Sequence, residues 1–481
     1  MNADVKYAKF TAKQRALIMI PLLIGGFIAL LNETILNVAF PQLMSSLNVS
    51  LSTVQWLGTA YMLIIGISVP VAAFLLKTFS TKKLYVSAMV LFSIGTILCG
   101  FSSDFISLIV ARILQGAGTG ILLPIMMDTI MEIYPPYKRG TAMGISMMVV
   151  VAAPGIGPTL SGFILQYLDW HWLFFIILPF STIAIILGMM FLRSFSDLTK
   201  PKIDILSIVF STIGFGGLIF GICSIENLGF LNLTVFISLL CGIVGLIIFS
   251  KRQLTLRQPM LELRAFRYPL FTLGTVLMFI SFMMPFAVNI ILPTYIQSVL
   301  GLTTSIAGLA LLPGCILNII IAPMAGRLFD KIGAKPLILV GFAALTIAMF
   351  FLSLTSWSTT LITLIALQSC MTLGIGLIFT PAQTNSLNHL PHNYRTHGIA
   401  ILNTSQQIAA AFGSSLFIGL MGATIAKNLE KIGNPDILQQ QAAIISGVNT
   451  AFTAALVMVV MGLILSFFIK QHENVFIDRT K

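Results

Sequence analysis

Apolar residues in this chain come in long continuous runs that short polar segments separate. Each run is about 20 residues long, the length a helix needs to cross the hydrocarbon core of a bilayer. The runs do not alternate polar and apolar residues as the strands of a membrane β-barrel do, so they predict helices. We expect fourteen spans, at 16–38, 53–76, 84–103, 105–133, 141–167, 171–192, 203–225, 231–250, 270–295, 305–325, 336–354, 359–381, 398–424 and 446–470.

The positions of the basic residues test this count independently. An even number of spans returns the C-terminus to the side on which the N-terminus starts. With fourteen spans, 24 of the 27 Lys and Arg residues fall in the two terminal segments or in every second loop. Such an excess marks the cytoplasmic side of a membrane protein. We therefore expect an uncleaved first span, both termini in the cytoplasm, and a multi-pass protein of a cell membrane, with a bacterium as the source.

Composition agrees with a membrane protein and excludes other classes. The chain is 57% hydrophobic and 9% charged, with a mean hydropathy of +1.00. A soluble protein of this length could not bury so much apolar surface. The net charge of +12 is spread over short cytoplasmic segments, where it meets anionic lipid, so nucleic acid is not expected as a partner. The five cysteines fall inside spans without close pairing and indicate neither disulfides nor a metal site.

Two segments of the chain recur at a distance of 252 residues. The stretch from Asn37 resembles the stretch from Asn289, and 74–83 resembles 326–335. In the two copies, Ser52 and Thr304 stand where the next helix needs an N-cap. We infer two six-helix halves at 1–200 and 259–481, with two inserted transmembrane helices and their linker at 201–258. Repeated halves with a site near the bilayer midplane are typical of secondary transporters.

Four local motifs carry a family resemblance. In the stretch GRLFDKIGAK, Asp330 can cap or pair at neighbouring helix ends, and Gly326 and Gly333 permit tight turns. Its N-terminal copy lacks both glycines and the Asp. The other three motifs are LIVARILQGAGTGILLP at 108–124 with Arg112, APGIGPTLSG at 153–162 with Gly155, Gly157 and Pro158, and PMLELRAFRYPLF at 259–271.

Together these motifs resemble the major facilitator superfamily, and within it the fourteen-span drug:proton antiporters of the EmrB/QacA type. The resemblance implies an all-α integral membrane fold with a cavity between the halves, open to each side in turn. The Gly-Pro motif marks the antiporters of the superfamily. No Gly-Lys-Ser/Thr P-loop is present in the sequence, so we expect energy from an ion gradient or from the substrate's own gradient. The resemblance to drug:proton antiporters implies a proton gradient, without a cofactor.

The first span departs from the usual signature of that family, which reads Leu-Asp-x-Thr. Here Asn32 takes the Asp position and Glu33 follows it, a variant that resembles the lincomycin- and multidrug-efflux-like subgroup. Glu33 and Arg112 should lie at one depth, where a carboxylate and a guanidinium can neutralise each other. We expect Glu33 to carry the proton and Arg112 to tune it; the alternative is a permanent ion pair that locks two helices. Asp128, near the inner end of its span, is either a relay or a headgroup-region partner of basic residues.

The C-terminal half has no carboxylate within the predicted span limits. At the position that the repeat pairs with Glu33, it has Pro285. It offers amides instead, and uncharged hydrogen-bonding groups among apolar side chains suit apolar substrates. The alternative is that amides bind helices to one another. The predicted cavity residues are Asn32, Asn37, Asn289, Gln368, Gln383, Asn403 and Gln407.

We therefore expect a proton-coupled antiporter that exports small, largely apolar drugs or toxic compounds. Its expected partners are hydrophobic or cationic small molecules, protons and membrane lipid, and we expect a monomer. The first alternative is a dedicated exporter of an endogenous metabolite or signalling nucleotide, and the second is a nutrient importer. An enzyme is not expected, since neither a metal cluster nor a Ser-His arrangement is evident in the sequence.

Overall fold

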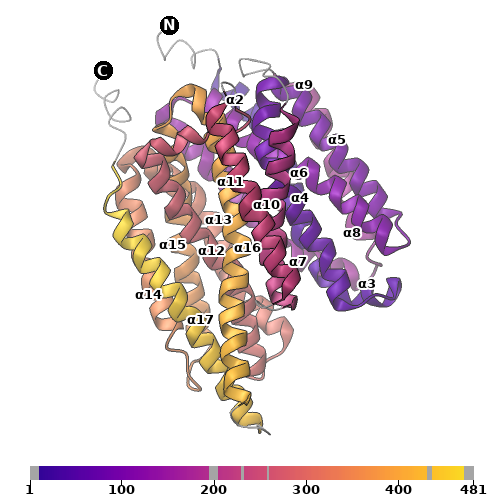
Figure 1. Ribbon diagram of the computed structural model, residues 1–481, viewed down its shortest axis with the longest axis vertical. Coiled ribbons are helices and arrows are strands. Elements are labelled where there is room, and N and C mark those ends of the chain that lie inside the picture. Colours follow the sequence, from indigo (N-terminus) through magenta and orange to yellow (C-terminus); the bar gives the residue numbers. More distant parts are fainter. Residues whose placement is uncertain (1–9, 194–203, 229–231, 257–258, 431–435, 471–481) are drawn as a thin grey trace.

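The computed structural model describes residues 10–193, 204–228, 232–256, 259–430 and 436–470. Within these residues all of the regular secondary structure is helical, and fourteen helices are long and apolar enough to cross a membrane. The predicted fold class and number of spans are confirmed. Helix α2 begins and helix α17 ends at the same end of the bundle (Figure 1), which we call the terminal side.

The N-terminal half begins most of its long helices with a side-chain cap. Thr11, Ser50, Ser80 and Asp104 each accept a hydrogen bond from a backbone N–H of the first turn. The predicted cap Ser52 was wrong by two residues, since Ser50 takes that place. The elements are α2 (Ala12–Thr34), η1 (Asn37–Ala39), α3 (Phe40–Leu47), α4 (Leu51–Thr78), α5 (Thr81–Gly100), α6 (Phe105–Ile133), η2 (Pro136–Lys138), α7 (Arg139–Leu165), α8 (Trp172–Phe175) and α9 (Ile177–Phe191).

The first span is broken near its far end. We expected it to run over 16–38, but α2 ends at Thr34, and the chain continues through η1 into α3, which has a proline in its first turn. Asn48, with a φ of 52°, then ends α3 in the left-handed conformation that Asn tolerates better than most residues. Glu33 therefore sits in the last turn of α2, beside the break.

The inserted pair comprises α10 (Ile205–Leu228) and α11 (Leu233–Thr255), followed by η3 (Leu263–Arg267). Helix α10 packs on α11 and also on α4 and α16, one helix from each half. Arg252 donates two hydrogen bonds, of 2.8 and 2.9 Å, to the carboxylate of Asp204 and so closes the pair at the terminal side. The amide of Gln253 then ties this end to Ser207 and to the backbone of Leu261 in the connector.

The C-terminal half repeats the order of the first. Helices α13 and α14 begin 253 residues after α4 and α5, which agrees with the repeat in the sequence. The predicted cap Thr304 was wrong by one residue, because Thr303 accepts the bond. The helices are α12 (Pro269–Ser298), α13 (Thr304–Ile332), α14 (Ala334–Leu352), α15 (Leu361–Asn388), α16 (His392–Glu430) and α17 (Ile437–Ser466).

The two halves meet along two edges. Helix α7 packs on α13 and helix α4 packs on α16. Glycines make the first edge close: a Cβ on Gly326 would overlap the carbonyl oxygen of Gly140 and lie 3.1 Å from the Cα of Gly144. Small residues let helix backbones approach where the surrounding lipid offers no hydrophobic drive.

Candidate functional site

Arg112 is the centre of a buried polar cluster in the N-terminal half. It lies on α6, and its residue is fully buried. Its Nη1 donates to the carbonyl of Asn32 at 3.0 Å and to Oε1 of Gln115 at 3.1 Å, and its Nε donates to the carbonyl of Leu57 at 3.3 Å. The guanidinium thus connects α2, α4 and α6, and it binds α2 at Asn32, the residue before Glu33.

Neighbouring side chains hold this guanidinium in place. Its carbon lies 4.1 Å from the centre of the Tyr61 ring, a distance at which a cation and a ring face attract each other. The Tyr61 hydroxyl donates to the carbonyl of Ala29 at 2.8 Å and pairs with the Thr119 hydroxyl at 2.6 Å. Gln115 donates to Thr96 at 2.9 Å. The sequence analysis missed Tyr61 and Gln115, although Gln115 stands one helical turn after Arg112 on the same face.

Glu33 lies at one level with Arg112 but is not bonded to it. The residue is 8% exposed, and among the described contacts its carboxyl has no hydrogen bond and no ion pair within 4 Å. The alternative of a permanent ion pair between Glu33 and Arg112 is not seen in this conformation, because backbone carbonyls of α2 and α4 accept hydrogen bonds from the guanidinium. Nη2 of Arg112 and both amide atoms of Asn32 are buried without a hydrogen-bond partner. The carboxyl of Glu33, without a hydrogen bond among the described contacts, thus lies near buried N–H donors that also lack a hydrogen bond.

The Gly-Pro motif packs directly beside Glu33. Helix α7 runs without interruption through its two prolines. A Cβ on Gly157 would overlap the Thr34 hydroxyl and touch the carbonyl of Leu31, and one on Gly155 would overlap the sulfur of Cys315 on α13. Thr34 also donates to the carbonyl of Pro154 at 3.3 Å. The motif therefore connects the end of α2 with a helix of the other half, so a shift of one can move the other.

Asp128 faces the opposite half at the terminal side. Its Oδ1 accepts a hydrogen bond of 2.7 Å from Thr396 on α16. One turn further along α6, Glu132 lies 2.7 Å from Nε2 of His392, also on α16. These contacts place Asp128 in the closure between the halves.

Asp330 closes the neighbouring edge. Its carboxylate accepts hydrogen bonds from the backbone N–H groups of Gly140 and Thr141, at 3.0 and 2.8 Å, and from the Thr141 hydroxyl at 2.5 Å. It therefore caps the first turn of α7, where a negative charge also meets the positive end of the helix dipole. Gly333, with a φ of 84°, ends α13 three residues later. Contacts such as these hold the two halves together at the terminal side.

The predicted amides differ in exposure. Gln383, Gln368 and Asn403 are buried, and each has a buried amide atom without a hydrogen-bond partner. Gln383 donates to the sulfur of Met127 across the halves at 3.1 Å. Asn289 is exposed and Gln407 is half-buried. The side chain of Asn37 lies outside the described residues.

Comparisons with known proteins agree with this architecture. The sequence model of the Major Facilitator Superfamily matches residues 22–414. The chain belongs to the major facilitator superfamily. It is 45% identical over 457 residues to the lincomycin resistance protein LmrB of Bacillus subtilis, covering 94% of this chain and 95% of that one. It is 28% identical over 415 residues to the multidrug export protein EmrB of Escherichia coli, covering 84% of this chain and 79% of that one.

The fold agrees with solved structures of the superfamily. The human organic anion transporter MFSD10 superposes with a TM-score of 0.68 at 12% identity, covering 94% of this chain and 99% of that one. Identity this low shows the fold alone. Membership of the superfamily makes the chain a multi-pass membrane transporter and not an enzyme, and it confirms the resemblance to fourteen-span drug transporters.

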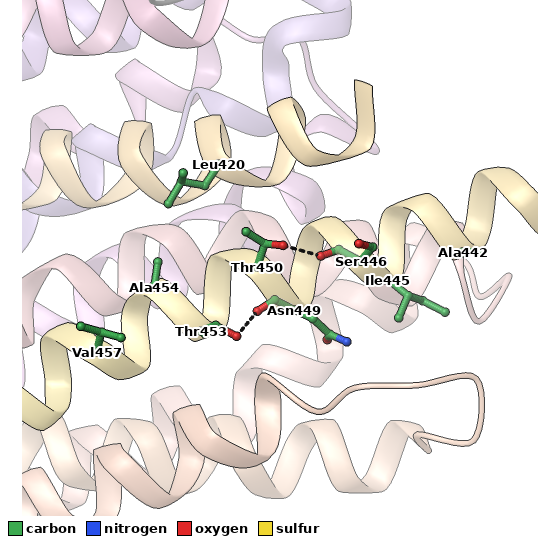
Figure 2. Close-up of a pocket in the computed structure, with 9 residues that line it drawn as sticks. All are labelled: Leu420, Ala442, Ile445, Ser446, Asn449, Thr450, Thr453, Ala454 and Val457. Atoms are coloured by element: carbon green, nitrogen blue, oxygen red, sulfur yellow. Dashed lines mark hydrogen bonds between the residues drawn. The ribbon is translucent and has the colours of Figure 1, made fainter. Parts of the chain in front are cut away.

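This member of the superfamily also has a surface groove away from the predicted site. The groove has a volume of about 700 Å³ and lies between α16 and α17. Figure 2 shows Thr450 and Thr453 bonded to Ser446 and Asn449, one turn back on α17. The Asn449 amide is itself bonded to Thr355. None of the predicted cavity residues lines this groove, so the predicted cavity between the halves stays a prediction.

Proposed function

We propose that the chain is a proton-coupled antiporter that exports small, largely apolar drugs from the cytoplasm and so confers resistance to antibiotics. The observation that carries this proposal is Glu33, a buried acid without a hydrogen bond at the break of the first span. Intramembrane ionisable groups are functional by default, because keeping them there is costly. Relatives named for lincomycin resistance and multidrug export support drugs as the substrates.

The terminal side is the cytoplasmic side in this proposal. The positive-inside rule supports this orientation, since both chain ends and the loops of that side carry most of the Lys and Arg residues. The location is then the cytoplasmic membrane of a bacterium, with protons, drugs and lipid as partners. The energy comes from the proton gradient, without a cofactor.

Coupling would run through the contact between α2 and α7. A proton that enters from outside neutralises Glu33, and a neutral acid needs neither water nor a cation in a buried position. Because Thr34 and Leu31 pack on Gly157, a change at the end of α2 shifts α7 and with it α13. A drug that binds better to the ionised form competes with the proton, so inward flow of protons drives the drug out.

The buried amides would contact the substrate. Amide atoms of Gln368, Gln383 and Asn403 are buried without a partner, and a buried unpaired polar group costs about 1–3 kcal/mol. A substrate with a few hydroxyl or carbonyl groups on an apolar body could pair with them. This supports uncharged or singly charged drugs over polyanions.

The test is drug export by the variant Glu33→Gln in inverted membrane vesicles. Gln resembles the neutral acid in size, so the protein should fold and insert, and gradient-driven export should fall to the level of empty vesicles. Downhill exchange of drug without a gradient should persist. The matched control is Asp169→Asn, an acid of the same half whose side chain is 63% exposed, which should export normally. Gradient-driven export at the wild-type rate by Glu33→Gln would remove Glu33 from the mechanism and direct attention to Asp128.

A further inference from the structure

The two edges of the terminal-side closure use different chemistry. At the α7–α13 edge the carboxylate of Asp330 caps α7. The repeat places Thr78 at the matching position of the other half, and this hydroxyl donates only to its own helix, to the carbonyl of Phe74. The α4–α16 edge is closed by the preceding residue instead: Nζ of Lys77 lies 2.6 Å from Nε2 of His397.

This contact constrains the protonation of the pair. A hydrogen bond between two nitrogens needs one donor and one acceptor, and an imidazole nitrogen accepts only when it carries no proton. Because a charged lysine offers donors and no acceptor, the Lys77 ammonium is the donor, and the His397 ring is neutral with its proton on Nδ1. His397 is 3% exposed, and its Nδ1 is buried without a hydrogen-bond partner. The pair can hold its geometry only while it shares a single proton between the two facing nitrogens.

We propose that His397 is a second proton-binding residue of this transporter, whose protonation from the cytoplasm opens the α4–α16 edge. Two cationic donors cannot remain 2.6 Å apart in a part-buried place, because they repel each other and no acceptor fits between them. Protonation therefore separates α4 from α16. This inference rests on the proposed orientation and on transport by alternating access, but it does not depend on the role of Glu33.

Other charged groups around the pair do not remove this effect. Asp128 of α6 and Glu262 of the connector are near enough to Lys77 to act on its charge. Asp128 is engaged by Thr396, and Glu262 lies 3.6 Å from Arg264. Both carboxylates stabilise the positive charge of Lys77, so Lys77 stays protonated when His397 also gains a proton. The two cations then repel each other, and His397 must move away from Lys77.

Two more groups of α16 face this closure. Protonating His392 would strengthen its contact with Glu132 and so oppose opening. Arg395 donates to the carbonyl of Leu390 and stays charged throughout the physiological range. Protonation of His397 favours opening of this edge, whereas protonation of His392 opposes it. Variants of the two histidines therefore distinguish this proposal from a general effect of acid on the protein.

The test is a distance measurement across the terminal side of the full chain in lipid nanodiscs. Nitroxide labels are placed on cysteines at Lys82 and Asn393, both exposed, in a background without the five native cysteines. Pulsed electron paramagnetic resonance then measures the closed and open populations between about pH 8 and about pH 5.5, the range in which histidine titrates. In the otherwise unaltered background the open-to-closed ratio should rise on acidification, by at most about tenfold per pH unit for one proton.

The variant His397→Gln keeps an acceptor for Lys77 and cannot be protonated, so it should stay closed throughout. His389→Gln is the matched control: His389 lies near the terminal end of α15, bonded to the carbonyl of Asn385, and its replacement should leave the response intact. His392→Gln should open at least as readily as the background. A background without an acid response, or His397→Gln with an unchanged response, would overturn the proposal.

Two further variants keep the test decisive. If His397→Gln does not fold, Lys77→Met serves instead; it removes the opposing cation and should abolish the acid response, and a full response would refute the proposal. Glu33→Gln should retain acid-driven opening. Normal drug export by Glu33→Gln would thus remove Glu33 from the proposed mechanism while leaving this measurement to decide on His397.

Discussion

Replacing Gly326 by alanine should open the terminal side at the α7–α13 edge. The added Cβ would overlap the carbonyl oxygen of Gly140 and lie 2.8 Å from its carbonyl carbon. Ordinary contacts between carbon atoms are about 3.5–4.0 Å, so the helices must separate by roughly 1 Å. The obstacle is backbone, which cannot change rotamer to relieve the contact.

The magnitude follows from the overpacking alone, which costs about 1–3 kcal/mol. This cost applies to the closed conformation, because the contact exists only while α7 and α13 are close. The gain in helix propensity from Gly to Ala is the same in both conformations, so it does not offset the cost. Since about 1.4 kcal/mol is a factor of ten, the closed population should fall relative to the open one by roughly 5-fold to 150-fold.

The assay uses labels at Tyr137 in η2, just before α7, and at Ile332 at the end of α13, which are 43% and 46% exposed. Gly326→Ala should show a longer distance and slower gradient-driven export. Gly308→Ala on the same helix is the matched control, since a Cβ there meets nothing within 4 Å. It should leave the distance unchanged and raise thermal stability slightly. An unchanged distance and export rate in well-folded Gly326→Ala would refute the view that this glycine contact holds the closure.

Two other contacts lead to predictions of their own. Arg112→Ala should lower the free energy of unfolding by about 1–3 kcal/mol for each of the two carbonyls, of Asn32 and Leu57, that lose their donor. Arg112→Lys should lose less, and equal thermal unfolding of both variants and wild type in detergent would contradict the pinning role. Hydrogen bonds from Arg252 lower the pKa of Asp204 to about 2, so the stabilisation from this half-exposed pair is present above the unfolded value near 4 and is lost as pH falls towards 2. Asp204→Asn should therefore destabilise by about 0.5–1 kcal/mol equally at about pH 8 and pH 5, and a pH-dependent difference within that range would contradict the assignment.

Much of the fold could be predicted because a bilayer imposes a length and a polarity on every span. The fourteen runs depend on local composition, and the described residues contain fourteen helices long and apolar enough to cross a membrane. Helix ends were less predictable. Helix α16 begins at His392, not at 398, and α2 ends at Thr34, not at 38, because caps and breaks depend on single residues and their neighbours.

The residues of the candidate site could be predicted from the sequence, but the hydrogen bonds between them could not. An acid and an arginine within apolar spans can be recognised from the sequence, and so can a motif glycine. Whether the donors of Arg112 meet Glu33 or the carbonyls of Asn32 and Leu57 depends on the rotation of three helices and on the break in the first span. A window of residues along the chain contains no information on that rotation.

By itself the sequence determined the class of this protein: a fourteen-span transporter with two repeated halves, an acid in the first span and a carboxylate motif in the second half. Only the tertiary structure decided which groups face one another across the halves. Lys77 and His397 are 320 residues apart, and Asp128 and Thr396 are 268 apart. The reason is physical: hydrophobicity and helix length act along the chain, whereas a hydrogen bond needs two atoms within about 3 Å, which only the packing of helices can provide.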